Sequence, residues 1–329
     1  MLTEYTSWRW CLFINVPIAV AAALAAVRTI PEVAPEPGRH RYDVPGALTV
    51  TAGSLALVYG LTRAGQGCGW LAVGTVLLLA VAVVVLAFVR GHRAAQHNPL
   101  LPLRVVLDRV RGGAFTTSAL LSAGMFAMFL FLAYYLQLDL GYSPVLAGSA
   151  ILPFSLGLIA TAWAAARLLP RYGPRPLLVG GALAATMAMI WLARLQATFG
   201  SPGGVLPAMI VMRAGLGLLF VPLSSVALTG VRPADAGVAS ALLNATQQIG
   251  GAVGVALLNT LYTASQTRSI AAGSTTLEAH LAGHRIAFTV AAVFFAAALL
   301  VITLATHQAR RPRPTSATPA GHNRHPDPP

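Results

Sequence analysis

The sequence contains no lysine, and only nine of its 329 residues are Asp or Glu. Charged residues make up 9% of the chain, whereas soluble globular domains carry about 25%. Hydrophobic residues account for 56%, and the mean hydropathy is +0.71. Composition therefore excludes an ordinary soluble protein and predicts a protein that lies in a membrane.

The sequence also lacks the residue patterns of several common sites. Cys11 and Cys68 show neither disulfide nor metal-ligand spacing. There is no phosphate-binding glycine loop and no Ser-His-Asp arrangement, so we expect no enzyme, no metal and no cofactor. The eight histidines lie mostly in predicted loops and in the tail, where we expect solvated or topological roles.

Nine apolar stretches are present, each long enough to cross a hydrocarbon core that needs about 20 residues. They are residues 11–27, 44–62, 70–89, 114–136, 144–168, 177–195, 205–230, 237–263 and 286–306. The first could be read as a secretory signal, but Glu4 and the many later spans argue against this. The expected fold is all-α, a polytopic membrane protein with about nine transmembrane helices.

The 22 arginines give the chain a formal charge of +13 and predict its orientation. Such a charge can indicate nucleic-acid binding, but these arginines lie between the apolar stretches, where an excess marks the cytoplasmic side. With the N-terminus outside, the cytoplasmic set is Arg28, Arg39, Arg41, Arg90, Arg93, Arg104, Arg109, Arg111, Arg167, Arg171, Arg175, Arg232, Arg310, Arg311, Arg313 and Arg324. The outer set is Arg9, Arg63, Arg194, Arg268 and Arg285. We therefore expect the N-terminus outside, the C-terminus in the cytoplasm and no nucleic-acid partner.

Four segments, in order along the chain, resemble the signatures of one transporter family. They are SWRWCLFINVPIAV, YDVPGALTVTAGSLALVYGL with the following GW, YYLQLDLGYSPVLAGSAILP, and DAGVASALLNATQQIGGAVGVALL. They resemble the WRWxFxINVPIG signature and three later motifs of the fourteen-helix drug:proton antiporters of the major facilitator superfamily, the EmrB/QacA type. The resemblance covers the chain up to about residue 306.

The resemblance implies a division of the chain, because the WRW signature opens the sixth helix of that family. Residues 1–28 would be the last helix of an N-terminal bundle, and residues 29–111 two linking transmembrane helices with cytoplasmic loops. Residues 112–306 would form a six-helix C-terminal bundle, and residues 307–329 a disordered cytoplasmic tail. The chain would then be an N-terminally truncated exporter of drugs or lipophilic metabolites in the cell membrane, driven by a proton gradient.

A second, partial likeness lies in AARLLPRYGPRPLL, which resembles the G-x-L-x-D-R-x-G-R loop motif of the superfamily. Arg171, Gly173 and Arg175 match it, and Arg167 stands beside them, but Pro170 replaces the acid. These arginines either bond to helix-end carbonyls and hold one gating state, or serve only as positive anchors on the cytoplasmic side.

The stretch 237–263 carries polar amides on one helical face, including Asn244 and Gln248. An unsatisfied amide in hydrocarbon costs several kcal/mol, so these side chains either line a substrate path or bond to another helix. Small residues favour close helix packing, and we expect Pro153 to pack in the same way. The predicted packing set is Gly148, Pro153, Gly250, Gly251 and Gly254.

Arg213 lies about nine residues into its span, hence about 13 Å deep at 1.5 Å per residue. An arginine at the midplane costs about 2.5 to 3.5 kcal/mol, so it needs a partner or a cavity. We expect it to contact an anionic or polar substrate group, with a structural pair or snorkelling as the alternative. Tyr134 and Gln137 are further candidates for the substrate path, although aromatic residues near a helix end are also typical interface anchors.

No acid stands in the middle of a predicted span. Asp139 lies at an outer end, Glu278 in an outer loop, and Asp43 and Asp235 at inner helix starts. The resemblance places coupling carboxylates in early helices that this chain lacks, so we expect that the chain alone does not catalyse coupled transport. Its partners would be the bilayer and small lipophilic or cationic substrates. One alternative is a non-transporting subunit whose partner supplies the missing helices, and another is a non-functional gene fragment.

Overall fold

The structure of the chain is a computed structural model that describes residues 9–29, scattered positions between 48 and 63, and residues 109–194, 202–231 and 235–307. Within these residues every regular element is a helix. Six helices have the length and composition of membrane spans, which confirms an all-α, multi-pass membrane protein. The predicted span 70–89 and the tail 308–329 lie outside the described residues, as do most of the span 44–62 and of the linking region 29–111.

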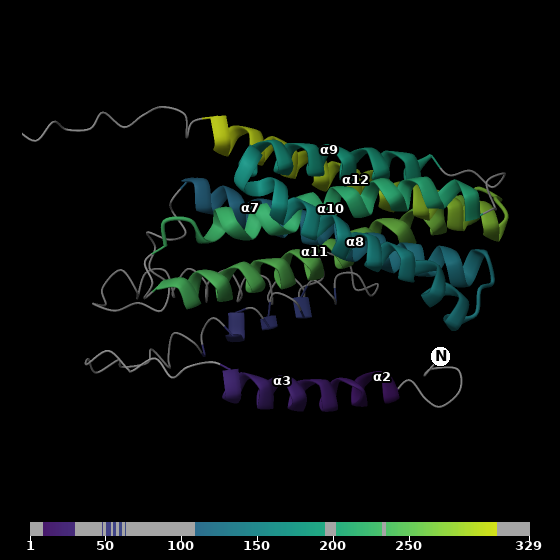
Figure 1. The fold of residues 1–329 in the computed structure, drawn as a ribbon. Helices are drawn as coiled ribbons and strands as arrows, with labels where there is room; N and C mark the ends of the chain where they lie inside the picture. The colour runs from purple at the N-terminus through teal and green to yellow at the C-terminus, as the bar shows by residue number, and fades with distance from the viewer. Residues whose placement is uncertain are drawn as a thin grey trace, which may run out of the picture.

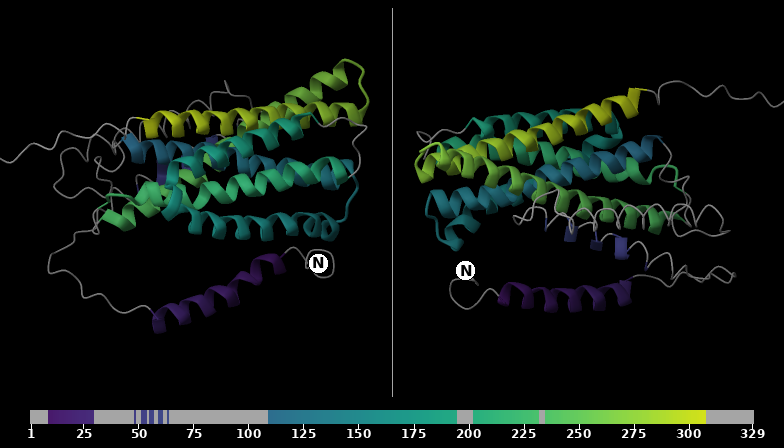
Figure 2. Two further views of the ribbon diagram at one scale, coloured as in Figure 1. Left: turned by 45° about the horizontal axis from the view of Figure 1, so that its top comes forward. Right: turned by 180° about the vertical axis from the view of Figure 1, so that it is seen from behind.

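The six long helices follow one another along the second part of the chain. They are α7 (Arg109–Tyr134), continued by the π-helical segment η2 (Tyr135–Asp139), α8 (Pro144–Tyr172), α9 (Pro174–Ala193), α10 (Pro202–Leu228), α11 (Ala236–Ala271) and α12 (Thr276–His307). Two N-terminal helices, α2 (Trp10–Phe13) and α3 (Asn15–Thr29), are drawn apart from these six in every view (Figures 1 and 2), and α3 buries no residue.

The six helices pack side by side as one bundle (Figure 1). α7 lies against α11 and α12, and α10 lies against α8 and α9. Contacts of α9 with α12 and of α7 with α10 join these two groups. α8 has the least covered surface, because Leu152, Leu156, Ile159 and Trp163 are all exposed.

Glycines set the distance between α7 and α11. A Cβ atom added to Gly250 would lie 2.7 Å from the Cα atom of Ala119, and one added to Gly254 would lie 2.5 Å from the Cα atom of Ala123. Real Cβ atoms do not approach backbone so closely, so only glycine allows this contact. Small residues at this spacing let two helix backbones touch, which is how helices gain packing energy in a bilayer.

Large apolar side chains fill the space that the backbones leave. Met128 and Phe131 of α7 and Phe288 and Phe295 of α12 are all fully buried. Phe295 lies so close to α7 that a Cβ atom on Gly124 would stand 2.6 Å from its ring. These residues form a close-packed interior in which added volume is poorly tolerated.

The ends of α11 and α12 differ from the prediction. The sequence pattern ends one span at residue 263 and begins the next at 286, whereas α11 runs to Ala271 and α12 starts at Thr276. Gly273, with φ +85°, turns the chain after α11, and the Ser274 N–H donates to the Ser269 carbonyl over 3.1 Å. The turn between the two helices is therefore short.

A capping box begins α12. The Thr275 N–H donates to a Glu278 carboxylate oxygen over 2.9 Å, and the Glu278 N–H donates to the Thr275 hydroxyl over 3.3 Å. The prediction that Glu278 lies in a loop is wrong, because this reciprocal pair places it in the first turn of a helix.

Replacing Gly254 by alanine tests the backbone contact between α7 and α11. We expect Gly254→Ala to lower the free energy of unfolding of the purified chain in micelles by about 1 to 3 kcal/mol, because the new methyl group must push the helices apart. Gly148→Ala is the matched control, since a Cβ atom on that helical glycine meets nothing within 4 Å. Equal stability of the two variants in a denaturant titration would contradict the close contact.

Candidate functional site

Arg213 of α10 lies across α8. Its Nη1 donates to the backbone carbonyl of Pro153 at 3.4 Å. A Cβ atom on Gly157 would lie 2.7 Å from the Arg213 Nε, so this glycine leaves room for the side chain. Within the described residues, no Asp or Glu forms an ion pair with Arg213. The structure thus gives this arginine a backbone partner, while its contact with a substrate stays a prediction.

Thr161 ties the same two helices together. Its hydroxyl lies 3.0 Å from the Arg213 carbonyl oxygen in α10 and 2.9 Å from the Gly157 carbonyl oxygen in its own helix. Gly217 makes this approach possible, because a Cβ atom there would stand 2.6 Å from the Thr161 Cβ. The backbone of α10 at Arg213 is therefore held against α8.

Two of the polar amides of α11 are on its exposed surface. Asn244 and Gln248 are both exposed, and the Asn244 amide donates to the Ser240 carbonyl of its own helix at 3.3 Å. The neighbouring Gln247 instead lines a small pocket together with Ser118 and Ser122 of α7. Among the described residues neither Asn244 nor Gln248 bonds to another helix, and their place in a substrate path stays a prediction.

Tyr134 and Gln137 lie at the end of α7. Tyr134 packs its ring against Phe131 with 6.0 Å between centroids and lies 6.5 Å from the Tyr262 ring of α11. Gln137 is exposed and belongs to the π-helical segment η2. Tyr134 is thus part of an aromatic group, and Gln137 is available to solvent, lipid or another chain.

The predicted gating motif forms the junction between α8 and α9. Gly173 has φ +74° and caps both helices, a backbone conformation that favours glycine. Arg171 stands in the last turn of α8 and Arg175 in the first turn of α9. The Arg167 guanidinium lies 3.5 Å from the centroid of the Trp163 ring, so this arginine stacks on its own helix.

The remaining members of the predicted packing set differ in their surroundings. Gly251 faces the ring of Phe126, from which a Cβ atom would lie 2.8 Å away. Pro153 is exposed and contributes its carbonyl to Arg213. Gly148 is exposed, with open space where a Cβ atom would lie.

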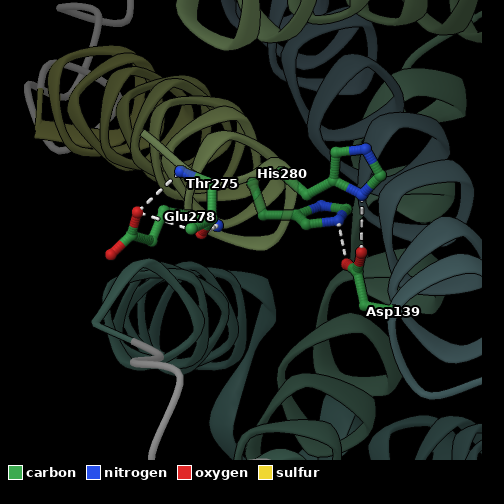
Figure 3. Close-up of polar contacts among 5 residues, drawn as sticks. Asp139, Thr275, Glu278 and His280 are labelled. Carbon is green, nitrogen blue, oxygen red and sulfur yellow. Dashed lines mark hydrogen bonds and ion pairs between the residues drawn. The ribbon is translucent and has the colours of Figure 1, made fainter. Parts of the chain in front are cut away.

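Asp139 is bonded to two histidines that the sequence analysis did not connect with it. His280 Nδ1 and His284 Nε2 of α12 each lie 2.8 Å from a different oxygen of the Asp139 carboxylate (Figure 3). The side chains of Asp139 and His284 are 3% and 5% exposed, and that of His280 is 22% exposed. The expectation of a solvated role is therefore wrong for these two histidines.

Local structure explains how the two halves of this cluster are placed. The π-helical segment η2 ends at Asp139, where the wider turn is closed by the Leu140 N–H donating to the Tyr135 carbonyl over 3.1 Å. Single π-helical turns of this kind are frequent at functional sites. His280 and His284 are four residues apart, so they lie on one face of α12. That spacing was the available signal, and it was hidden because the sequence pattern began the helix at residue 286.

Aromatic rings surround the buried imidazole. The His284 ring centroid lies 5.1 Å from that of Tyr262, 5.8 Å from Tyr135, 6.1 Å from Phe288 and 6.2 Å from Phe131. The Phe288 ring is stacked and the Tyr135 ring is edge-on. His284 Nδ1 is buried and has no hydrogen-bond partner among the described residues.

The comparisons with known proteins agree with the helical architecture. The profile of the Major Facilitator Superfamily matches residues 1–255. The puromycin resistance protein pur8 of Streptomyces alboniger is 42% identical over 308 residues, which is 92% of this chain and 60% of that protein.

Two further relatives are similar over shorter or more divergent alignments. The lincomycin resistance protein of Streptomyces lincolnensis is 36% identical over 78% of this chain and 53% of its own length. The cephamycin export protein CmcT of Amycolatopsis lactamdurans is 33% identical over 92% of this chain and 61% of its own length. The chain thus spans less than two thirds of the length of each of these relatives.

A substitution of Thr161 tests the bond that holds α8 to α10 at Arg213. Thr161→Val removes the hydroxyl, and we expect it to lower the free energy of unfolding in micelles by about 0.6 kcal/mol, the average for such bonds in a bilayer protein. Thr186→Val is the control, because within the described part of the chain the Thr186 hydroxyl bonds to the Ala182 carbonyl of its own helix and to no other helix. If both variants lose the same stability, Thr161 makes no useful contact with α10.

Proposed function

The chain belongs to the Major Facilitator Superfamily, and on that premise we propose that it takes part in the export of small antibiotics or related metabolites across the cell membrane. The observation that carries the proposal is the 42% identity to a puromycin resistance protein over 92% of the chain. Relatives named for lincomycin resistance and cephamycin export support the same class of activity.

The arrangement of the helices supports a role for residues 112–306 as the carboxy-terminal six-helix bundle of a fourteen-helix transporter. In the same proposal, residues 1–28 form the last helix of the other bundle, and residues 29–111 supply two linking helices. The N-terminus lies outside and the C-terminus in the cytoplasm, as the distribution of arginines favours. The junction with Arg171, Gly173 and Arg175 then lies on the cytoplasmic side, where it stabilises one gating state.

The mechanism that follows is alternating access, in which one bundle rocks against the other around a central site. Arg213 is the charged group of this bundle that we assign to an anionic or polar part of the substrate, because its guanidinium bonds to a backbone carbonyl of α8 and to no acid within the described residues. Asn244, Gln248, Tyr134 and Gln137 extend the polar and aromatic surface offered to lipophilic or cationic substrates. Proton antiport supplies the energy.

Neutralising Arg213 tests this assignment. In the native host, with the gene in its own genomic context, we expect Arg213→Gln to lower the initial rate of antibiotic export about tenfold, because a hydrogen bond to a charged group is worth about 1.5 to 3 kcal/mol. The measurement is efflux of a preloaded antibiotic, puromycin first, from energised cells.

Arg268→Gln is the matched control, since Arg268 is exposed in the last turn of α11. Equal export by the two variants at equal protein levels would remove Arg213 from the substrate path. Unchanged accumulation after deletion of the whole gene, for puromycin and for lincomycin, would contradict the proposed function itself.

A further inference from the structure

We propose that Asp139, His280 and His284 form a proton-binding site that takes up one proton per chain at this end of the bundle. The proposal rests on the proposed function only for the use to which that proton is put, namely coupling to export. The binding itself follows from the bonding, charge and burial of the three side chains.

The hydrogen bonds fix the charge of the cluster before the proton arrives. An ionised carboxylate only accepts hydrogen bonds, so both imidazoles must donate to it, His280 through Nδ1 and His284 through Nε2. With only these two ring protons present, the second nitrogen of each imidazole is unprotonated and the cluster carries one negative charge. A buried single charge is costly, and one added proton cancels it.

His284 supplies the nitrogen that receives the proton. Its Nδ1 is buried without a partner among the described residues, and four aromatic rings lie around the imidazole. The faces of aromatic rings attract a cation, and Phe288 presents its face to His284. In the protonated state a new N–H bond forms at Nδ1, an O–H bond of a hydronium ion breaks, and no other bond order changes.

His280 is the member of the cluster nearest to solution. Its side chain is 22% exposed, against 5% for His284, and it stands one helical turn nearer the start of α12. Asp139 bonds to both rings, so a proton on the cluster is paired with the same carboxylate whichever imidazole carries the added charge.

The other titratable groups that face Asp139 do not compete for this proton. Among the described residues they are the phenols of Tyr135 in η2 and Tyr262 in α11, with Tyr142 beside the first and Tyr134 beside the second. The described residues of α8 and α10 at this end carry no titratable side chain. Arg285 of α12 lines a separate cavity with Arg194 of α9, and Glu278 is bonded to Thr275, on the other side of the start of α12 (Figure 3).

Proton uptake also changes the link between two helices. The carboxylate belongs to the end of α7 and both imidazoles belong to α12, so a proton turns one charged hydrogen bond of this link into an ion pair. Charge-assisted bonds are the stronger ones, and the gain tightens α7 against α12. Coupling requires that proton binding change the packing of the helices, and this site meets that requirement.

The test counts protons on the purified full-length chain in micelles. Potentiometric titration from pH 8 to pH 5.5 measures the protons bound by the wild type and by His284→Gln, which keeps an N–H donor for Asp139 but has no nitrogen to protonate. We expect His284→Gln to bind one proton fewer per chain. We expect Asp139→Asn to lower the affinity of the cluster for that proton about tenfold or more. An opposite charge at this distance changes proton affinity by about ten- to a thousandfold.

Glu278→Gln is the matched control, because it removes an equal charge from the same end of the bundle without touching the cluster. Its titration should follow the wild type over this range. A His284→Gln chain that binds as many protons as the wild type, while its circular dichroism and elution volume are unchanged, would overturn the proposal.

Transport separates this inference from the proposed function. If export driven by a proton gradient is equal in His284→Gln and wild type, the site has no coupling role and this part of the inference is wrong. If the cluster binds its proton but the wild type exports nothing, the proposed function fails while the proton site stands.

Discussion

Hydrocarbon offers no hydrogen bonds, and this constraint governs every polar group in the bundle. Most threonines satisfy it locally, as Thr186, Thr246 and Thr260 do by bonding to the carbonyl four residues earlier. Polar side chains that reach another helix are therefore informative. In the described part of the chain two such places stand out, the contact of Arg213 and Thr161 between α8 and α10, and the cluster of Asp139 with two histidines between α7 and α12.

The two contacts differ in chemistry. Arg213 carries a permanent charge and binds a neutral carbonyl, so this contact does not change with pH. The Asp139 cluster joins a carboxylate to imidazoles, the side chains that change charge near neutral pH. We propose the first contact for a substrate and the second for a proton, and both depend on the same close packing. Gly157 makes room for Arg213, and Gly283 lets the Tyr262 ring approach α12 beside His284.

Much of the bundle could be predicted because its signals are local. Runs of apolar residues locate each of the six long helices, and Gly250 and Gly254 stand at the predicted close contact, with the backbone of α7 against them. The start of α12 was missed because the polar residues of its first turns resemble a loop, although Thr275 and Glu278 form a capping box. The cluster was missed for another reason, since Asp139 and His280 are 141 positions apart and nothing local pairs them.

The central claim is that Asp139 accepts a hydrogen bond from both imidazoles. Nitrogen-15 NMR of the histidine-labelled chain at pH 8.5, with ring signals assigned through His280→Gln and His284→Gln, tests it most directly. We expect opposite tautomers, with the proton on Nδ1 in His280 and on Nε2 in His284. Two rings that share one tautomer mixture, unchanged by Asp139→Asn, would contradict it.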